Sequence, residues 1–229
     1  MAEMAKANGG DYEQMKECKT CLILCGGLAT RFRPITEEIP KALVEINGKP
    51  ILEQQLHWLL KQGYKKIILA CGYKHEMIKD WIAENGKEKY SKYGSFELNL
   101  SIEKKPLGTA GAIKLAGELI ESEKFLVVNG DNLTDLNLNK LEAKSGHSLT
   151  LIQLPFRFGL VDIGNDGRLE FKEKPRLLVN AGIYHFRKDI LHALPKKGSL
   201  EKEILPTLEL NPYIHNGFWK TYDKAEDLK

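Results

Sequence analysis

The chain has 229 residues, of which 42% are hydrophobic and 28% are charged, and its formal net charge is +3. This composition argues against a nucleic-acid-binding protein, because the charge is small and the lysines are mixed with acids along the chain. No apolar run reaches transmembrane length, and the N-terminus lacks the apolar segment of a signal peptide, so we expect a cytoplasmic protein without a membrane anchor.

Residues 1–19 are polar and predict a flexible leader, whereas residues 20–229 have the length of a single domain. Cys18 and Cys21 have the spacing of a metal or redox pair. No second pair follows at a matching distance, so we expect the cysteines to be small buried hydrophobic residues.

Strand and helix patterns alternate along the first part of the domain. Short apolar or alternating runs predict strands at 21–25, 43–46, 66–70, 96–102 and 125–129, and helical spacing predicts helices at 50–63, 75–84 and 109–119. Further along we expect a helix from residue 137, a strand at 148–154, a hairpin of 160–163 with 168–173, and a helix at 199–208. This order predicts an α/β, Rossmann-like three-layer fold with a mostly parallel mixed sheet.

The strand at 21–25 ends at Gly26-Gly27, where the backbone can turn sharply and approach a ligand closely. Main-chain N–H groups aligned in such a loop suit a phosphate, and the cations Arg31, Arg33 and Lys41 follow. The alternative is a plain turn with solvated basic side chains. Neither the P-loop motif nor Gly-x-Gly-x-x-Gly is present, so neither a P-loop NTPase nor a dinucleotide dehydrogenase is indicated.

The segment from Gly26 to Pro34, followed by Pro40-Lys41-Ala42 and by Asn47 to Pro50, resembles the signature of the sugar-1-phosphate nucleotidyltransferases, or NDP-sugar pyrophosphorylases. Ala29 stands where that family usually has glycine, and Ala42 where it usually has proline. If position 29 needs a positive φ, alanine is strained there. The resemblance implies a nucleotide-binding part at about 20–135 and a sugar-phosphate-binding part at about 136–229.

A second segment, Glu103 to Gly111, joins a strand to a helix, and by itself it reads as a turn with Thr109 as N-cap. Its Pro106-to-Gly111 portion resembles the base-binding segment of the mannose-1-phosphate guanylyltransferases. The resemblance implies that Glu103 reads the nucleobase. A carboxylate can accept from N1–H and N2–H of guanine, although uracil or thymine also offers one N–H.

Asp131 follows the strand at 125–129, and its sequence context alone fits a helix N-cap or an Asx turn about as well as a metal ligand. The resemblance implies that it holds Mg²⁺, an ion that favours one or two carboxylates with phosphate oxygens and water. Many relatives carry a second metal-binding aspartate in a Trp-x-Asp motif, where this chain has Thr221. Asp223 lies two residues further, on the same face of an extended strand, and we expect it to replace that aspartate.

The implied reaction joins an NTP to a sugar 1-phosphate to give an NDP-sugar and pyrophosphate. We expect GTP with mannose 1-phosphate or a related hexose phosphate. CTP, UTP or dTTP as the nucleotide and a catalytically weak regulatory homologue remain alternatives, and a homo-oligomer is possible. The Glu-Lys-Pro and Asn-x-Gly segments, which supply partners for sugar hydroxyls, argue against a choline-type phosphate. The resemblance assigns nucleotide binding to Leu24, Gly26, Gly27, Thr30, Arg31, Glu103, Pro106, Gly108 and Thr109, sugar-phosphate binding to Gly159, Glu173, Lys174, Asn180 and Gly182, catalysis to Arg31, Lys41, Asp131 and Lys174, and the metal to Asp131 and Asp223.

Overall fold

The computed structural model describes residues 19–85 and 88–228. The predicted leader and Cys18 therefore lie outside the described residues, apart from Lys19. Among the described residues, no helix is long and apolar enough to span a bilayer.

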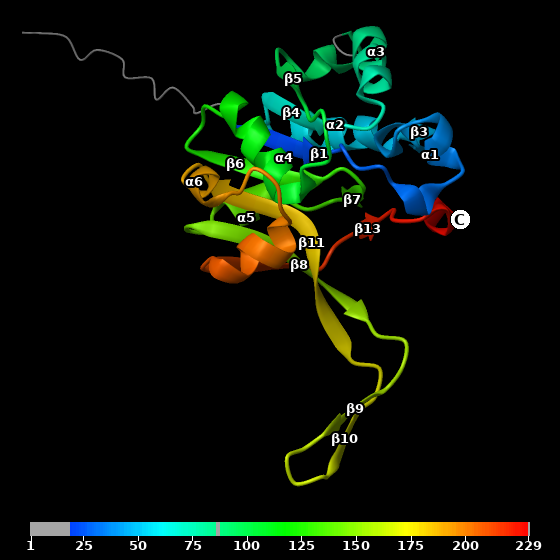
Figure 1. The fold of residues 1–229 in the computed structure, drawn as a ribbon, viewed down its shortest axis with the longest axis vertical. Coiled ribbons are helices and arrows are strands. Elements are labelled where there is room, and N and C mark those ends of the chain that lie inside the picture. The colour runs from blue at the N-terminus through cyan, green and yellow to red at the C-terminus, as the bar shows by residue number, and fades with distance from the viewer. Residues whose placement is uncertain (1–18, 86–87, 229) are drawn as a thin grey trace, which may run out of the picture.

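The core of the fold is a seven-stranded sheet in the order β12-β8-β11-β6-β1-β4-β5 (Figure 1). The strand β11 runs antiparallel to its neighbours β6 and β8, and the other four neighbouring pairs are parallel. The mostly parallel mixed sheet predicted from the sequence is thus confirmed. Its strands are β1 (Thr20–Leu24), β4 (Lys66–Cys71), β5 (Glu97–Ile102), β6 (Lys124–Asn129), β8 (His147–Pro155), β11 (Arg176–Arg187) and β12 (Leu210–His215).

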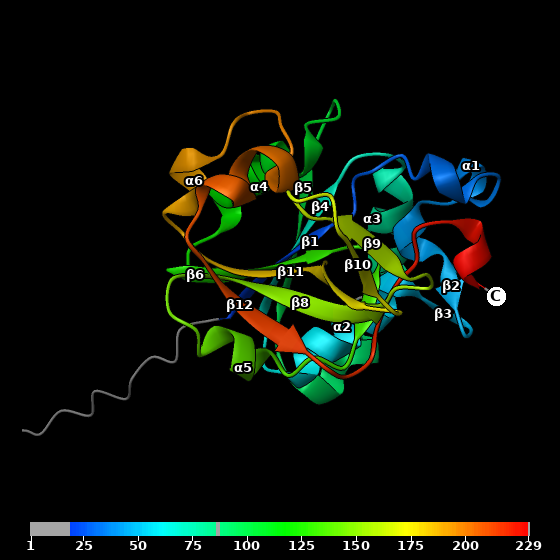
Figure 2. The ribbon, with the colours of Figure 1, turned by 90° about the horizontal axis from the view of Figure 1, so that it is seen from below.

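Helices cover both faces of the sheet, as Figure 2 shows. On one face lie α2 (Ile51–Lys61), α3 (His75–Asn85) and α5 (Leu138–Glu142), and on the other α4 (Gly108–Ala116) and α6 (Ile190–Ala193). Successive residues of β1 point to opposite faces, as the pleat of a strand requires. Cys21 and Ile23 pack in the α2 cluster, whereas Leu22 packs in the α4 cluster.

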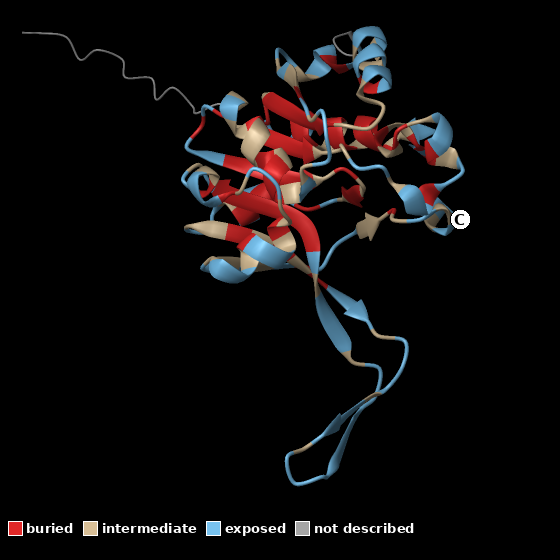
Figure 3. Cartoon of the chain, in the orientation of Figure 1, coloured by how far each residue is buried: buried red, intermediate tan, exposed pale blue. Residues whose placement is uncertain are grey.

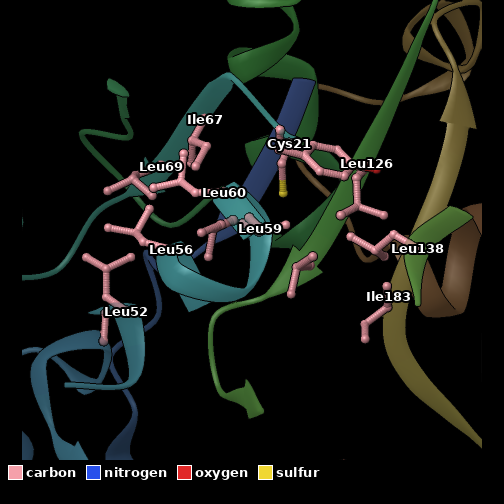
Figure 4. Packing of buried hydrophobic residues seen from close by; sticks show 14 of the residues in the cluster. Cys21, Leu52, Leu56, Leu59, Leu60, Ile67, Leu69, Leu126, Leu138 and Ile183 are labelled. Atoms are coloured by element: carbon pink, nitrogen blue, oxygen red, sulfur yellow. The ribbon is translucent and has the colours of Figure 1, made fainter. Parts of the chain in front are cut away.

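The helix α2 shows how the sequence produces this packing. Its Leu52, Leu56 and Leu59 recur at helical spacing and are almost completely buried against the sheet (Figure 4). Each contributes about 1.5–3 kcal/mol relative to an exposed side chain. Gly63, with a φ of 86°, ends the helical segment in a conformation that favours glycine.

The remaining elements are short. They are α1 (Ile35–Glu38), β2 (Glu45–Ile46), β3 (Lys49–Pro50), β7 (Asn132–Thr134) and β13 (Trp219–Thr221), with 3₁₀ turns at Thr30–Phe32, Lys41–Leu43, Glu88–Tyr93, Gly117–Leu119, Leu205–Thr207 and Ala225–Leu228. The strand predicted at 43–46 is reduced to β2. The helix predicted at 199–208 is a single π turn, Leu200–Ile204, followed by a 3₁₀ turn. The Ser199 side chain caps the π turn by accepting from the N–H of Lys202.

A two-stranded arm extends from the ends of β8 and β11. It consists of the predicted hairpin, β9 (Leu160–Ile163) with β10 (Leu169–Lys172), and it points away from the sheet (Figure 1). Figure 3 shows that its surface is almost entirely exposed. Four apolar side chains share one face of this arm and are at least half exposed: Val161, Ile163, Leu169 and Phe171.

Candidate active site

A pocket of about 1050 Å³ opens at the carboxyl ends of β1, β4, β5 and β6. Ligands gather at this end of the strands in open parallel sheets. Eight of the nine predicted nucleotide-binding residues line the pocket, and the ninth, Thr30, does not appear in its lining. The eight are Leu24, Gly26, Gly27, Arg31, Glu103, Pro106, Gly108 and Thr109.

The two glycines of the first loop have different surroundings. A Cβ atom at Gly26 would lie 2.8 Å from Oε1 of Glu103 and 3.1 Å from the backbone nitrogen of Gly72, so neighbouring chain segments occupy that space. A Cβ at Gly27 would meet no heavy atom within 4 Å. Gly26 is therefore explained by internal packing, whereas the open side of Gly27 is available to a ligand.

Ala29 has φ 45° and ψ 47°, so this position does adopt the left-handed conformation that glycine tolerates best. Such a conformation costs an alanine about 1–2 kcal/mol. The backbone is fixed locally, because the carbonyl of Ala29 accepts hydrogen bonds from the Phe32 N–H and from the Thr36 hydroxyl. The departure from the family pattern is thus accommodated as local strain.

The segment after β5 is held by its own hydrogen bonds. Oε2 of Glu103 accepts a hydrogen bond from the backbone N–H of Leu107 at 2.9 Å. Among the described residues, no hydrogen bond to Oε1 accompanies it. Thr109 does not cap α4; its hydroxyl donates to Oε2 of Glu201 and accepts from the N–H of Leu200, both at 2.8 Å. Thr109 therefore ties α4 to the π turn while also lining the pocket.

Gly108 begins α4 with a φ of 73°, and a Cβ there would lie 2.3 Å from the carbonyl oxygen of Gly198. Close backbone packing explains this glycine without a ligand.

Two cations and two carboxylates converge at the pocket from segments far apart in the sequence. Nζ of Lys41 lies 2.7 Å from Oδ2 of Asp131 and 3.9 Å from Oδ1 of Asp223, and Arg31 forms an ion pair with the second oxygen of Asp223. Lys41 is the most buried of the four, with 16% of its side chain exposed, whereas Arg31 has 71% exposed. In this arrangement each cation is matched by a carboxylate, and all four side chains line the pocket.

The C-terminal segment brings Asp223 to this cluster. β13 pairs antiparallel with β7, which follows Asp131 directly, and the backbone N–H of Tyr222 donates to the carbonyl of Asp131 at 2.9 Å. The two aspartates are therefore held by adjoining backbone segments. A Cβ at Gly130 would lie 2.5 Å from the carbonyl of Leu24, so only glycine lets β6 approach β1 this closely.

Asp131 and Asp223 are the two carboxylates that the resemblance implies as metal ligands. Among residues 19–85 and 88–228, no three His, Cys, Asp or Glu side chains form a metal-binding group. Asp131 and Asp223, however, both reach the same Lys41 ammonium. Two converging carboxylates completed by substrate oxygens and water fit Mg²⁺, which seldom takes an all-protein ligand set.

The predicted sugar-phosphate residues do not line this pocket. Gly159, Glu173 and Lys174 lie where the arm begins and ends, and the side chains of Glu173 and Lys174 are 85% and 71% exposed. Asn180 and Gly182 lie on β11. The Asn180 side chain donates to the hydroxyl of Tyr184 and accepts from the N–H of Gly182.

Gly182, with a φ of 69°, lies against Asn129 and Asn132: a Cβ there would be 2.4 Å from Nδ2 of Asn129 and 2.6 Å from Nδ2 of Asn132. The structure therefore places Gly182 at the end of β6, beside the residues that flank Asp131. Asn132 itself is nearly buried, and its side chain donates to the carbonyl of Ala181 at 2.6 Å.

Several pocket residues were not singled out from the sequence. Lys104 and Lys105 follow Glu103 directly and add two cations to the lining, and Tyr73 and His75 enter from the end of β4. The two lysines belong to the segment already identified, so their position beside Glu103 was the available signal. Nothing local marked Tyr73 and His75, because only the pairing of β1 with β4 places them at the pocket.

Comparisons with known proteins agree with this geometry. The nucleotidyl transferase family model matches residues 20–217. The chain is 40% identical over 190 residues to D-glycero-alpha-D-manno-heptose 1-phosphate guanylyltransferase of Campylobacter jejuni, covering 79% of this chain and 82% of that protein. It is 35% identical to the mannose-1-phosphate guanylyltransferase catalytic subunit beta of Danio rerio, covering 90% of this chain but only 62% of that longer protein.

Among solved structures, HddC from Yersinia pseudotuberculosis complexed with GMP-PN is 31% identical, with a TM-score of 0.74 over 92% of this chain and 96% of that one. The chain therefore belongs to the nucleotidyl transferase family, and within it to the sugar-1-phosphate nucleotidyltransferases, as the motifs in its sequence predicted.

Proposed function

We propose that this protein joins GTP to a sugar 1-phosphate, either mannose 1-phosphate or a heptose 1-phosphate of related configuration, and releases pyrophosphate. The observation that carries the proposal is the convergence of Arg31, Lys41, Asp131 and Asp223 in the lining of a pocket that also contains several glycines. The choice of guanine is supported by the names of relatives that are 40% and 35% identical. A CTP-, UTP- or dTTP-dependent enzyme is the alternative.

The chemistry requires positioning and charge neutralisation rather than a side-chain nucleophile. A sugar-phosphate oxygen attacks the α-phosphorus of GTP in line, and no general base is needed because a phosphate monoester, with a second pKa of about 6, is already largely ionised. We assign Arg31 and Lys41 to phosphate oxygens of the triphosphate and of the leaving pyrophosphate, because both residues line the pocket. Preorganised cations of this kind stabilise charge that develops in the transition state.

We assign Mg²⁺ to Asp131 and Asp223, where the ion would offset the negative charge of the phosphate groups that react. Asp131 also holds the Lys41 ammonium at 2.7 Å, which orients this cation toward the pocket before substrate binds. Glu103 is assigned to the nucleobase through Oε1, since Oε2 already accepts from Leu107. The residues of the arm, Glu173 and Lys174, are assigned to the sugar phosphate, which requires the arm to approach the pocket.

The test is pyrophosphate release from GTP and mannose 1-phosphate or heptose 1-phosphate in the presence of Mg²⁺. Asp131→Asn is expected to lower the rate by about 100-fold or more, the scale of losing one preorganised electrostatic group. The matched control is Asp135→Asn, because Asp135 is 61% exposed and pairs with His215 outside the pocket lining. Near-normal turnover by Asp131→Asn would contradict the role assigned to this carboxylate. An equal loss of rate in Asp131→Asn and Asp135→Asn would show only that such substitutions damage the fold.

A regulatory homologue that binds sugar nucleotides without turnover is the candidate from another class. Its support is Ala29 and the Thr221 that replaces the usual aspartate. This candidate would be favoured if calorimetry showed GTP binding while no pyrophosphate was released with any of several hexose and heptose 1-phosphates.

A further inference from the structure

Two cysteines lie side by side at the carboxyl ends of β1 and β4, and one of them, Cys25, lines the nucleotide pocket. Cys71 is the last residue of β4, and Cys25 is the first residue after β1. The parallel register pairs Leu24 with Ala70, and the N–H of Cys25 donates to the carbonyl of Ala70 at 2.9 Å, so the next residues on the two strands are neighbours. Their Sγ atoms are 3.5 Å apart.

The backbone spacing suits a covalent bond between them. Neighbouring strands lie about 4.8 Å apart, and the Cα atoms of disulfide-bonded cysteines are usually about 4.4–6.8 Å apart. The sulfur atoms need to approach from 3.5 Å to about 2.05 Å, a movement that side-chain rotation can supply in large part.

The two thiols differ in access. Cys25 lines the pocket, whereas the side chain of Cys71 is fully buried. A hydrogen bond with Cys71 and burial raise the pKa of the Cys25 thiol above its ordinary value, so Cys25 is a slow nucleophile toward external reagents. Once Cys25 is oxidised, however, the second thiol is already within contact distance.

We propose that Cys25 and Cys71 form a reversible disulfide, a modification site beside the nucleotide pocket, with a hydroperoxide as oxidant. The sulfur of Cys25 attacks one peroxide oxygen, the O–O bond breaks, and the leaving oxygen departs as water or alcohol, which leaves a sulfenic acid. The sulfur of Cys71 then attacks the Cys25 sulfur, the S–O bond breaks and water leaves. The two thiols lose two electrons and two protons in total, and the peroxide takes up both electrons.

Formation of this bond would affect the pocket directly. Cys25 precedes Gly26 and Gly27, so drawing its sulfur toward Cys71 pulls on the start of the loop that faces the ligand. A misplacement of about 1 Å can cost an enzyme a factor on the order of 100. We therefore expect the disulfide form to lose activity about tenfold or more, and a bound nucleotide to slow its formation by covering Cys25.

The primary test uses folded protein that carries Cys18→Ser. It is treated with hydrogen peroxide and then analysed by peptide mapping. Trypsin releases Cys21 and Cys25 together in residues 20–31, and Cys71 in residues 67–74. We expect these two peptides to be joined, with the loss of two hydrogens. The link should persist in Cys21→Ser, vanish in Cys25→Ser and Cys71→Ser, and be reversed by dithiothreitol.

Circular dichroism before and after oxidation shows whether the fold is kept. Oxidation of Cys25 to sulfinic or sulfonic acid with Cys71 still reduced, a Cys21–Cys71 link, or no oxidation at all would overturn the proposal. The activity readout rests on the proposed function. If no pyrophosphate is released even by the untreated protein, the proposed function fails while the peptide map still decides the disulfide.

Discussion

Gly26 and Gly27 are adjacent in the sequence, but the structure gives them different reasons to be glycine. The backbone of Gly72 and the Glu103 carboxylate crowd Gly26, whereas the space around Gly27 is open toward the pocket. A sequence pattern cannot separate these reasons, because both produce the same letter. The resemblance names both as nucleotide-binding residues; both line the pocket, and of the two only Gly27 has open space beside its Cα.

The variant Gly27→Ala tests this assignment. Because Gly27 has no positive φ and an added Cβ meets no protein atom, we expect its unfolding free energy to stay unchanged or to rise by about 0.4–1 kcal/mol. If the backbone approaches the triphosphate here, the KM for GTP rises at least about tenfold, since a methyl group would lie between the loop and its ligand. Thermal unfolding and steady-state kinetics measure the two effects.

Gly26→Ala is the matched comparison. Its Cβ would crowd Glu103 and Gly72, so we expect it to lower the unfolding free energy by about 1–3 kcal/mol. An unchanged KM for GTP in Gly27→Ala would mean that the loop does not approach the nucleotide at this residue.

At the scale of elements, apolar and alternating runs located the strands well. A strand buried on both faces, such as β4, needs a continuous apolar sequence, whereas the edge strand β5 alternates. The predictions at 66–70, 96–102 and 125–129 match β4, β5 and β6 within about a residue or two at each end. The weaker predictions fell where tertiary contacts decide the conformation. The π turn at Leu200–Ile204 is one example, since Thr109 of α4 bonds to the N–H of Leu200.

The arm is the element for which the role implied by the sequence and the position seen in the structure differ. The resemblance places Glu173 and Lys174 at the sugar phosphate, whereas the structure leaves both side chains largely exposed at the base of an extended hairpin. Hairpin pairing is local and readable from the sequence. The angle between the hairpin and the sheet depends on contacts that the sequence does not reveal. An isolated two-stranded ribbon is marginal in water, and the assignment of Glu173 and Lys174 to the sugar phosphate requires the arm to approach the pocket.

We expect Lys174→Ala to raise the KM for the sugar 1-phosphate by about tenfold while leaving the KM for GTP unchanged, because one cation would be lost from the phosphate that must approach the triphosphate. The control is Lys172→Ala, on the same arm, where Lys172 pairs with Asp162 at 2.6 Å. Equal kinetics for Lys174→Ala and the wild-type protein would show that the arm does not carry a sugar-phosphate ligand.

At the scale of the whole molecule, residues from the first and the last parts of the chain meet at the pocket. Asp223, near the C-terminus, pairs with Arg31 near the N-terminus, and β13 lies along β7 to bring it there. The sequence predicted Asp223 as a metal ligand only because it lies two residues beyond the aspartate position of the Trp-x-Asp motif, on the same face of an extended strand. Its position beside Lys41 and Asp131 follows from long-range pairing that no local pattern contains.

Asp223→Asn separates a metal ligand from a residue that merely holds Arg31. If Asp223 binds Mg²⁺, this variant needs a higher Mg²⁺ concentration for half-maximal rate, on the order of tenfold or more, because a neutral amide is a poorer ligand for a hard cation than a carboxylate. Arg31→Ala should lower the rate by about 100-fold with little change in the Mg²⁺ requirement. The same Mg²⁺ titration curve for Asp223→Asn and the wild-type protein would contradict the assignment.

The most direct measurement is pyrophosphate release by the wild-type protein with Mg²⁺, using each of the four NTPs against a panel of hexose and heptose 1-phosphates. We expect the highest kcat/KM for GTP with mannose 1-phosphate or a manno-configured heptose 1-phosphate, and a nucleotide-linked sugar as the second product. Release of no pyrophosphate from any combination would contradict this expectation.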